Sequence, residues 1–357
     1  MKSLFYLVSM LLLAASVQAV EVTQLYQTEV TVNDRSRGER QRNYPKALTQ
    51  TLVKLTGDAQ IGSDPRVKKM LASATGYVSK FEYLSSPLRL QVNFDPSQLL
   101  KTMRQQRLPI WGNQRPLTLV WLATEDESGD RQMFSEQLPP ATLAQWQQSA
   151  DDKGLPLSLP LMDLEDAMRV SVNDVWGFFV DPIADASQRY RADFFALAKL
   201  SPTDEGWEYW VTLYPYEAPA SEDRYGFGNV RRSVMQSSGV LADDVAAKHA
   251  LQADIADYFA RRYASVASEE KGQKQLTFVL SGQMEELIEI ERYLNQQSSI
   301  SSATLVSLKD NQVSFEIEVV GSLQALRQIL ELDPKVEALP TDDQLVERSL
   351  YRWIGQP

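Results

Sequence analysis

Apolar residues in the first hundred positions follow two different periods. One face of a 3.6-residue period is marked by residues spaced four, four and three apart, Tyr44, Leu48, Leu52 and Leu55. Gly57 comes shortly after them, where a helix commonly ends in the left-handed conformation. Residues 88–94 alternate apolar and polar side chains, and residues 21–32 do so less regularly. The pattern predicts a helix between two strands in a small α/β unit.

A continuous apolar run, residues 117–123, opens a second unit directly after Arg115-Pro116. An unbroken run of this length is typical of a central strand covered on both faces. We expect further strands at 155–161, 192–200 and 207–214, and helical segments at 141–150, 164–190 and 241–263. This alternation of strands and helices predicts an α/β domain with a mixed sheet.

The last unit has the most regular pattern. Residues 313–319 alternate strictly, and a polar turn at Lys309-Asp310-Asn311 precedes them. With strands expected at 276–280, 303–308 and near Val336, and helices at 284–295 and 323–330, the order is βαββαβ. This order predicts a ferredoxin-like unit.

Together these patterns predict three mixed domains, of the α/β and α+β classes. The expected division is a signal peptide at 1–19, an amino-terminal α/β domain at 20–113, a central α/β domain at 114–264, a linker at 265–275, a ferredoxin-like domain at 276–340 and a carboxy-terminal tail at 341–357. The linker is small, charged and polar in composition, as exposed linkers are.

The first residues have the pattern of an export signal. Lys2 precedes a nearly unbroken apolar segment, residues 4–15, and Val17-Gln18-Ala19 reads as a cleavage site. The apolar segment is shorter than the roughly 20 residues that span a bilayer, so we expect cleavage after Ala19 and a periplasmic location without a transmembrane segment. The chain has no cysteine, which excludes a lipid-modified cysteine and disulfides.

Charge is distributed unevenly along the chain. Residues 20–113 hold fourteen Lys or Arg against eight Asp or Glu, and residues 114–357 hold twenty-one against thirty-nine. The net charges are therefore +6 and −18. A basic first domain is suited to meet an anionic envelope surface or an acidic partner, while the acidic remainder favours solubility. Export and the acidic balance argue against nucleic-acid binding.

Most of the usual catalytic chemistry is missing from the sequence. The only histidine, His249, lies in an expected helix, and no Gly-x-Ser-x-Gly motif accompanies it. Gly226-Phe227-Gly228-Asn229 lacks the third glycine of a dinucleotide loop and the Lys-Ser/Thr of a phosphate loop, so we interpret it as a turn. We therefore expect no cofactor and no enzymatic activity.

Three acidic residues, Asp163, Glu165 and Asp166, mark the junction between an expected strand and a helix. Carboxylates in such a place could bind Mg²⁺ or Ca²⁺, which makes Asp163 and Asp166 the candidate metal ligands. Carboxylates also cap helices and offset the positive end of the helix dipole, and this is the interpretation that we favour.

Arginine and aromatic residues are the remaining candidates, because they are common at protein interfaces. A basic run surrounds the start of the first helix, and aromatic and Arg residues crowd the middle of the chain. We expect Arg189 to satisfy carbonyls at a helix end. The interaction candidates are Arg35, Arg37, Arg40, Arg42, Lys46, Trp111, Arg115, Arg189 and Tyr190.

Several short motifs occur together in a particular order. They are Ala47-Leu48 through Leu55-Thr56-Gly57, Trp111 before Arg115-Pro116, Val120-Trp121-Leu122, residues 156–166 and residues 187–190. In this order the chain resembles, over nearly all of its mature length, the proteobacterial family known as domain of unknown function 2066. The resemblance implies no activity, ligand or catalytic residue, because none is established for that family.

The function that we expect from the sequence is an exported, non-enzymatic cell-envelope protein that binds other macromolecules as an accessory or scaffold protein. Its expected partners are envelope proteins or an anionic envelope surface. Two alternatives remain open, a hydrolase that depends on carboxylates or a divalent metal at Asp163 and Asp166, and a periplasmic carrier of a small ligand.

The mature protein is predicted to begin at Val20, because Val17-Gln18-Ala19 places small or aliphatic side chains at the two positions that signal peptidases recognise. Amino-terminal sequencing of the protein recovered from the periplasm measures this directly. Recovery of a chain that begins at Met1, or that stays in the membrane, would contradict the prediction.

Overall fold

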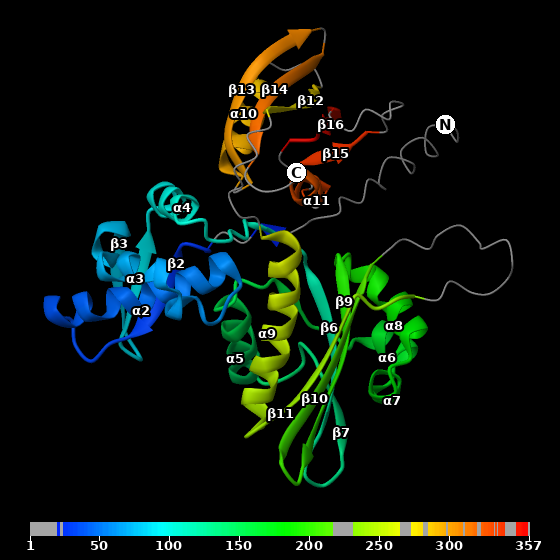
Figure 1. Cartoon of the computed structure of the whole chain (residues 1–357). Helices are drawn as coiled ribbons and strands as arrows, with labels where there is room; N and C mark the ends of the chain where they lie inside the picture. The colour runs from blue at the N-terminus through cyan, green and yellow to red at the C-terminus, as the bar shows by residue number, and fades with distance from the viewer. Residues whose placement is uncertain are drawn as a thin grey trace, which may run out of the picture.

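The computed structural model describes most of the chain after the expected signal peptide (Figure 1). The described residues are 20–21, 24–216, 231–264, 273–280, 285–297, 299–309, 311–319, 323–331, 333, 335–339 and 348–355. The expected signal peptide, the turn at 226–229 and residues 265–272 of the expected linker lie outside this part. The fold combines helices with three larger sheets and belongs to the α+β class, with mixed domains as predicted.

The first domain is a three-stranded antiparallel sheet covered by a long helix. The sheet order is β2-β4-β3, formed by Gln27–Thr31, Arg89–Phe94 and Val78–Leu84. Its helices are α2 (Arg37–Thr56), α3 (Pro65–Ala72) and α4 (Pro96–Gln105), with 3₁₀ turns η1 (Ile61–Ser63) and η2 (Ala74–Tyr77).

Helix α2 ends at the predicted Gly57 and begins at a cap that was not predicted from the sequence. The Ser36 hydroxyl accepts a hydrogen bond from the Glu39 amide at 3.1 Å and so caps the amino terminus. Gly57 ends the helix in the left-handed conformation, with φ of 72°. The predicted apolar face, including Leu48, Leu52 and Leu55, is fully buried in the core of this domain.

The central domain is a six-stranded mixed sheet with helices on both faces (Figure 1). The path is β11-β10-β9-β6-β7, with β8 beside β6. The strands are β6 (Thr118–Glu125), β7 (Arg131–Phe134), β8 (Leu157–Ser158), β9 (Phe194–Thr203), β10 (Gly206–Pro215) and β11 (Met235–Leu241). Strand β6 is parallel to β8 and β9, and the other neighbours are antiparallel.

The continuous apolar run of β6 serves two cores at once. Val120 and Leu122 face α5 (Pro140–Asp151) and α9 (Asp244–Tyr263). Leu119 and Trp121 face the other layer, which holds α6 (Leu164–Arg169), α7 (Val172–Trp176) and α8 (Val180–Ser187). Because consecutive residues of a strand point to opposite faces, a strand between two helix layers needs apolar residues at every position.

The last unit has the predicted βαββαβ order and one further strand, β16. Its elements are β12 (Gln273–Val279), α10 (Glu285–Gln296), β13 (Ile300–Lys309), β14 (Gln312–Val319), α11 (Leu323–Glu331), β15 (Val336–Ala338) and β16 (Arg348–Trp353). The sheet order is β13-β14-β12-β16-β15. Strand β12 begins inside the segment expected to be a linker.

The carboxy-terminal segment, expected to be a tail, supplies strand β16. This strand lies between β12, to which it is parallel, and β15, to which it is antiparallel. Tyr351 and Trp353 of β16 are buried and pack in the core of this unit with Phe278. Tyr351 and Trp353 are therefore core residues of the final sheet.

The first two domains meet around the buried side chain of Arg115. Arg115 belongs to β5 (Gln114–Arg115), which pairs with β1 (Val20–Glu21). Its guanidinium donates to the carbonyls of Lys54 on α2 (2.6 Å) and of Gly154 after α5 (2.7 Å). It also donates to three further carbonyls, those of Trp111, Gly112 and Lys153. One side chain thus joins helix α2, the connecting residues and the central domain.

Trp111 and Gly154 complete this joint. The Trp111 ring lies 3.8 Å from the Arg115 guanidinium carbon, and the Trp111 amide donates to the carbonyl of Leu55 at 2.6 Å. Gly154 has φ of 61°, and a side chain there would come within 2.6 Å of the Arg115 nitrogen Nη1. Trp111 and Arg115 are fully buried, so these two interaction candidates do not face a partner. The expectation from their residue types was wrong for this reason.

No helix in the described ranges combines the length and the apolar character that crossing a bilayer requires.

We expect Arg115→Met to lower the free energy of unfolding by roughly 3 kcal/mol or more. Methionine fills much of the space but donates no hydrogen bond, and each buried carbonyl left without a donor costs about 1–3 kcal/mol. Urea unfolding followed by tryptophan fluorescence measures the change. Arg37→Met, at an exposed position of α2, is the matched control, with an expected effect within about 0.5 kcal/mol. Equal stability of the two variants would contradict the role of Arg115.

Candidate functional site

The basic run at the start of α2 is mostly engaged with its own domain. Arg40 lies over the ring of Phe81 at 4.3 Å and donates to the Tyr83 hydroxyl at 3.3 Å. Arg35 donates to Ser85 at 3.0 Å. Arg42 pairs with the Glu39 carboxylate at 2.6 Å. Arg37 and Lys46 are exposed. Three of the five cations are therefore engaged with different neighbours in their own domain, and Arg37 and Lys46 stay candidates for long-range attraction.

His249 lies on α9 beside a small cavity. The cavity measures about 20 Å³ and is also lined by Phe134, Trp146 and Lys248. A space of this size has room for about one water molecule. Burial lowers the pKa of His249 below its ordinary value, which favours the neutral ring. This cavity gives no support to the small-ligand carrier.

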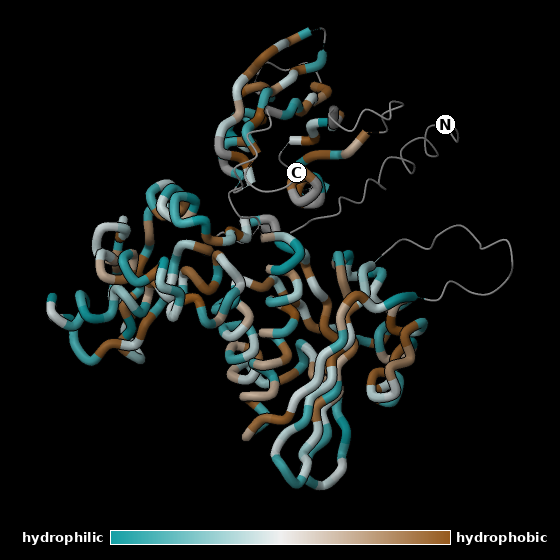
Figure 2. The backbone as a smooth tube through the Cα atoms, viewed as in Figure 1, coloured by the Kyte–Doolittle hydropathy of each residue, from teal (hydrophilic) through white to brown (hydrophobic). Residues whose placement is uncertain are grey.

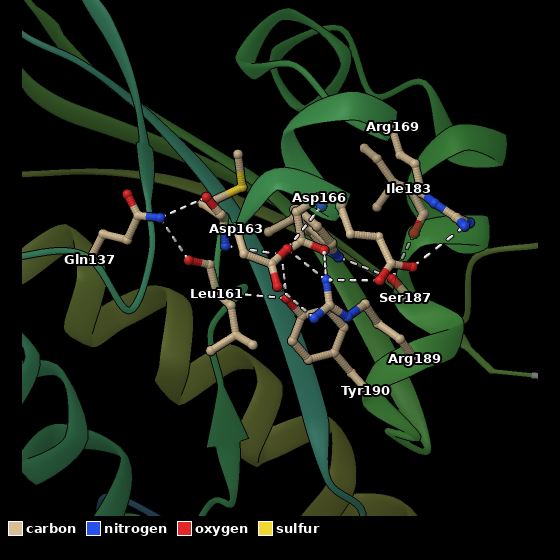
Figure 3. A network of polar contacts seen from close by, with 12 residues as sticks. Gln137, Leu161, Asp163, Asp166, Arg169, Ile183, Ser187, Arg189 and Tyr190 are labelled. Atoms are coloured by element: carbon tan, nitrogen blue, oxygen red, sulfur yellow. Dashed lines mark hydrogen bonds and ion pairs between the residues drawn. The ribbon is translucent and has the colours of Figure 1, made fainter.

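The strongest cluster of polar side chains lies where the loop after β8 meets the 3₁₀ turn η3 (Gln188–Tyr190), as Figure 3 shows. Asp166 is completely buried there. Its carboxylate accepts a hydrogen bond from the Tyr190 hydroxyl, one from the Met162 amide at 2.9 Å, and one from Arg189 at 3.1 Å. We call Asp163, Asp166, Arg189 and Tyr190 the Asp166 network.

Asp163 is the helix cap that we favoured over a metal ligand. Its side chain accepts a hydrogen bond from the Asp166 amide at 3.1 Å and so caps α6. Both of its carboxylate oxygens also pair with Arg189, each at 2.7 Å. The Arg189 guanidinium holds the pKa of the Asp163 carboxyl well below its usual range. In the described part of the chain, no group of three or more acidic, His or Cys residues is placed to hold a metal ion.

The sequence led us to expect that Arg189 satisfies carbonyls at a helix end, and the structure shows that it does not. It pairs with the carboxylates of Asp163 and Asp166 instead, and more distantly with Glu165 at 3.7 Å. The reason is that α6 and η3 are brought together by the sheet, which places a buried carboxylate within reach of the guanidinium. A buried carboxylate is costly without an opposite charge.

Tyr190 connects the network to the chain on both sides. Its hydroxyl accepts a hydrogen bond from the Leu161 amide at 2.8 Å while it donates to Asp166. Burial first, and then the bond to Asp166, raise the pKa of Tyr190, so the hydroxyl keeps its proton. The ring meets Trp121 edge to face at 6.2 Å, and the Trp121 indole nitrogen donates to Ser187 at 3.0 Å.

Gln137 holds the same loop from the other side. Its amide nitrogen donates to the carbonyls of Leu161 at 3.1 Å and Met162 at 2.6 Å. Met162 has φ of 51°, a left-handed conformation that is uncommon for a residue other than glycine. Phe178 and Arg191, nearby in the chain, are left-handed as well. Such strain persists only where surrounding contacts fix the backbone.

Large apolar side chains are exposed beside this fixed loop. The exposed fractions are 46% for Leu161, 77% for Leu164, 79% for Met168 and 58% for Phe179. We call these four residues the apolar surface. Leu164 and Met168 lie one helical turn apart on α6, and α6 packs against α8. Figure 2 shows hydrophobic residues along α6, α7 and α8.

The apolar surface was not predicted from the sequence. Leu164 and Met168 lie four residues apart between charged residues, which is also the pattern of a helix that buries one face. Asp166 is two residues from both Leu164 and Met168, which places it on the opposite side of α6 from them, so only one of the two sides can face the protein interior. The structure buries the carboxylate and exposes the aliphatic side chains, the reverse of what hydropathy predicts.

Comparison with known families identifies two segments of the chain. Residues 19–112 match the model of a domain of unknown function, DUF8605. Residues 272–345 match the model of DUF2066, which confirms the resemblance to that family for the last unit. The motifs that suggested the resemblance lie before residue 272, so the match covers a different and smaller part of the chain than we expected.

Comparison with characterised proteins and with solved structures adds little to this. No curated protein matches. The C-terminal domain of LpoB from Salmonella enterica is similar with 11% sequence identity and a TM-score of 0.22, over 41% of this chain and 93% of that domain. A likeness of this size carries no argument about fold or function.

We expect Tyr190→Phe to lower the free energy of unfolding by about 1–3 kcal/mol. The change removes the hydroxyl that links the Leu161 amide to the Asp166 carboxylate. The amide and the carboxylate then each lose one hydrogen bond. It should also speed hydrogen exchange at Leu161. Tyr258→Phe, on α9 across the sheet, is the control and should leave that exchange rate unchanged. An unaltered Leu161 rate in Tyr190→Phe would contradict the role of the hydroxyl.

Proposed function

We propose that this chain is an exported, non-enzymatic accessory protein of the cell envelope that works by binding another macromolecule. The observation that supports the proposal is the apolar surface of Leu161, Leu164, Met168 and Phe179. Burying a side chain of this kind contributes roughly 1.5–3 kcal/mol. The four side chains lie between residues 161 and 179 and are all exposed to water. The free energy of burying them is gained only when a partner covers them.

The Asp166 network supports the proposal because it fixes the backbone that carries the apolar surface. Leu161 is held through its amide by Tyr190 and through its carbonyl by Gln137. A surface whose backbone is already ordered loses less conformational entropy when a partner binds. The same network disfavours the hydrolase alternative, because the carboxylates of Asp163 and Asp166 are both engaged with Arg189.

The first domain contributes long-range electrostatic attraction to this function. Its net charge of +6 and the exposed Arg37 and Lys46 favour approach to an anionic envelope surface. Such attraction falls off over the Debye length, about 8 Å at physiological ionic strength. In this proposal it orients the protein, and the apolar surface makes the specific contact.

The experiment places a photocrosslinking amino acid at Met168 in cells that export the chain. We expect a discrete crosslinked product whose yield falls several-fold when Leu164→Ser is added, because the substitution removes a neighbouring apolar contact. Gln147, exposed on α5 on the opposite face of the sheet, is the control position and should give no such product. Equal labelling from both positions, or none from Met168, would rule out the apolar surface as the binding site.

A further inference from the structure

The helices that carry the apolar surface are strongly acidic. Between residues 164 and 187 the chain has five carboxylates, Glu165, Asp166, Asp174, Asp181 and Asp185, and one cation, Arg169. Asp166 is buried and neutralised by Arg189, whereas Glu165, Asp181 and Asp185 are exposed. Glu165 also lies 3.4 Å from Arg169 and 3.7 Å from Arg189, so the negative charge that accompanies the apolar surface rests chiefly on Asp181 and Asp185.

The negative charge decides which kind of partner can cover the apolar surface. An anionic lipid surface repels carboxylates, and its apolar interior lies behind that repulsion. An acidic polypeptide is repelled in the same way. A polypeptide with Lys or Arg beside its apolar side chains gains both contacts, since its cations meet the carboxylates while its apolar side chains cover Leu164 and Met168.

We infer that the partner covering Leu161, Leu164, Met168 and Phe179 is a basic amphipathic protein segment, with aliphatic or aromatic side chains on one face and Lys or Arg beside them. The inference rests on the proposed function and adds the chemistry of the partner. The segment is an element of a different protein. A second copy of this chain and a lipid surface are the outcomes that the test must distinguish from it.

The local geometry fits a short segment of this kind. Leu164 and Met168 project from one side of a helix of six residues, and Phe179 precedes the first turn of the neighbouring α8. Glu165 is half exposed and has two weak ion pairs, with Arg169 at 3.4 Å and with Arg189 at 3.7 Å, so an incoming cation competes with both for it. Asp181 and Asp185 lie one turn apart on α8.

The test uses the purified mature chain and two synthetic helical peptides with the same leucine positions. One peptide has Lys and the other Glu at every polar position. We expect the Lys peptide to bind at least about tenfold more tightly in fluorescence anisotropy, with an affinity that falls as salt is raised. Hydrogen exchange should slow in α6 and α8 when it binds.

Variants locate the site. Leu164→Ser with Met168→Ser, and separately Asp181→Lys with Asp185→Lys, should each weaken the Lys peptide about tenfold or more. The matched control is Glu127→Lys with Asp130→Lys in the turn between β6 and β7, which makes the same change in net charge on another surface. It should weaken binding at most about twofold, through the general field of the protein.

The results separate this inference from the proposed function. Equal binding of both peptides, or equal effects of the site and control charge variants, would overturn the basic partner while crosslinking at Met168 still supports a binding role. Binding to vesicles of anionic lipid that Leu164→Ser with Met168→Ser abolishes would also overturn it, as would a dimer of the chain alone that the same variant dissociates. Absence of the Met168 crosslink would remove the proposed function itself.

Discussion

The arrangement of the first two domains depends on one guanidinium that is removed from water. The hydrogen-bond acceptors of Arg115 in the described structure are backbone carbonyls, contributed by α2, by the connecting residues and by the segment after α5. Burial lowers the pKa of this group, since the charged form loses its hydration. The carbonyl dipoles and the Trp111 ring replace that hydration only while all three segments stay together. Separation of the two domains would break the hydrogen bonds that Arg115 donates to both of them, so this one side chain links their positions.

The Asp166 network places a second buried charge on the opposite helix layer of the same sheet, with a different consequence. Here the charge is a carboxylate, and Arg189 neutralises it directly. Removing polar atoms from water at Asp166 while leaving Leu164 and Met168 in water is unfavourable for folding by itself. In return, the loop that holds Leu161 and Met162 is positioned by hydrogen bonds to Tyr190 and Gln137, independently of apolar packing. The joint at Arg115 thus serves stability, whereas the Asp166 network serves the display of side chains.

Elements that repeat a local period were predictable, and contacts between distant segments were not. The spacing of Leu48, Leu52 and Leu55 and the stop at Gly57 predicted α2, and the alternation over 313–319 predicted β14. Residue type alone made Trp111 and Arg115 look like surface contacts, because no local pattern connects Arg115 to its acceptors at residues 54, 153 and 154, or Trp111 to the Leu55 carbonyl. For the same reason Arg189 was assigned to carbonyls. Asp163 was correctly interpreted as a cap, since a cap and its helix are neighbours in sequence.

Strand β16 has a consequence for the order in which the final sheet is assembled during synthesis. It is the last element of that sheet to leave the ribosome, yet it lies inside the sheet, between β12 and β15. Until residues 348–353 emerge, β12 has a free edge on that side and β15 has no neighbour to pair with. The two halves of the unit can therefore close only after translation has passed residue 353.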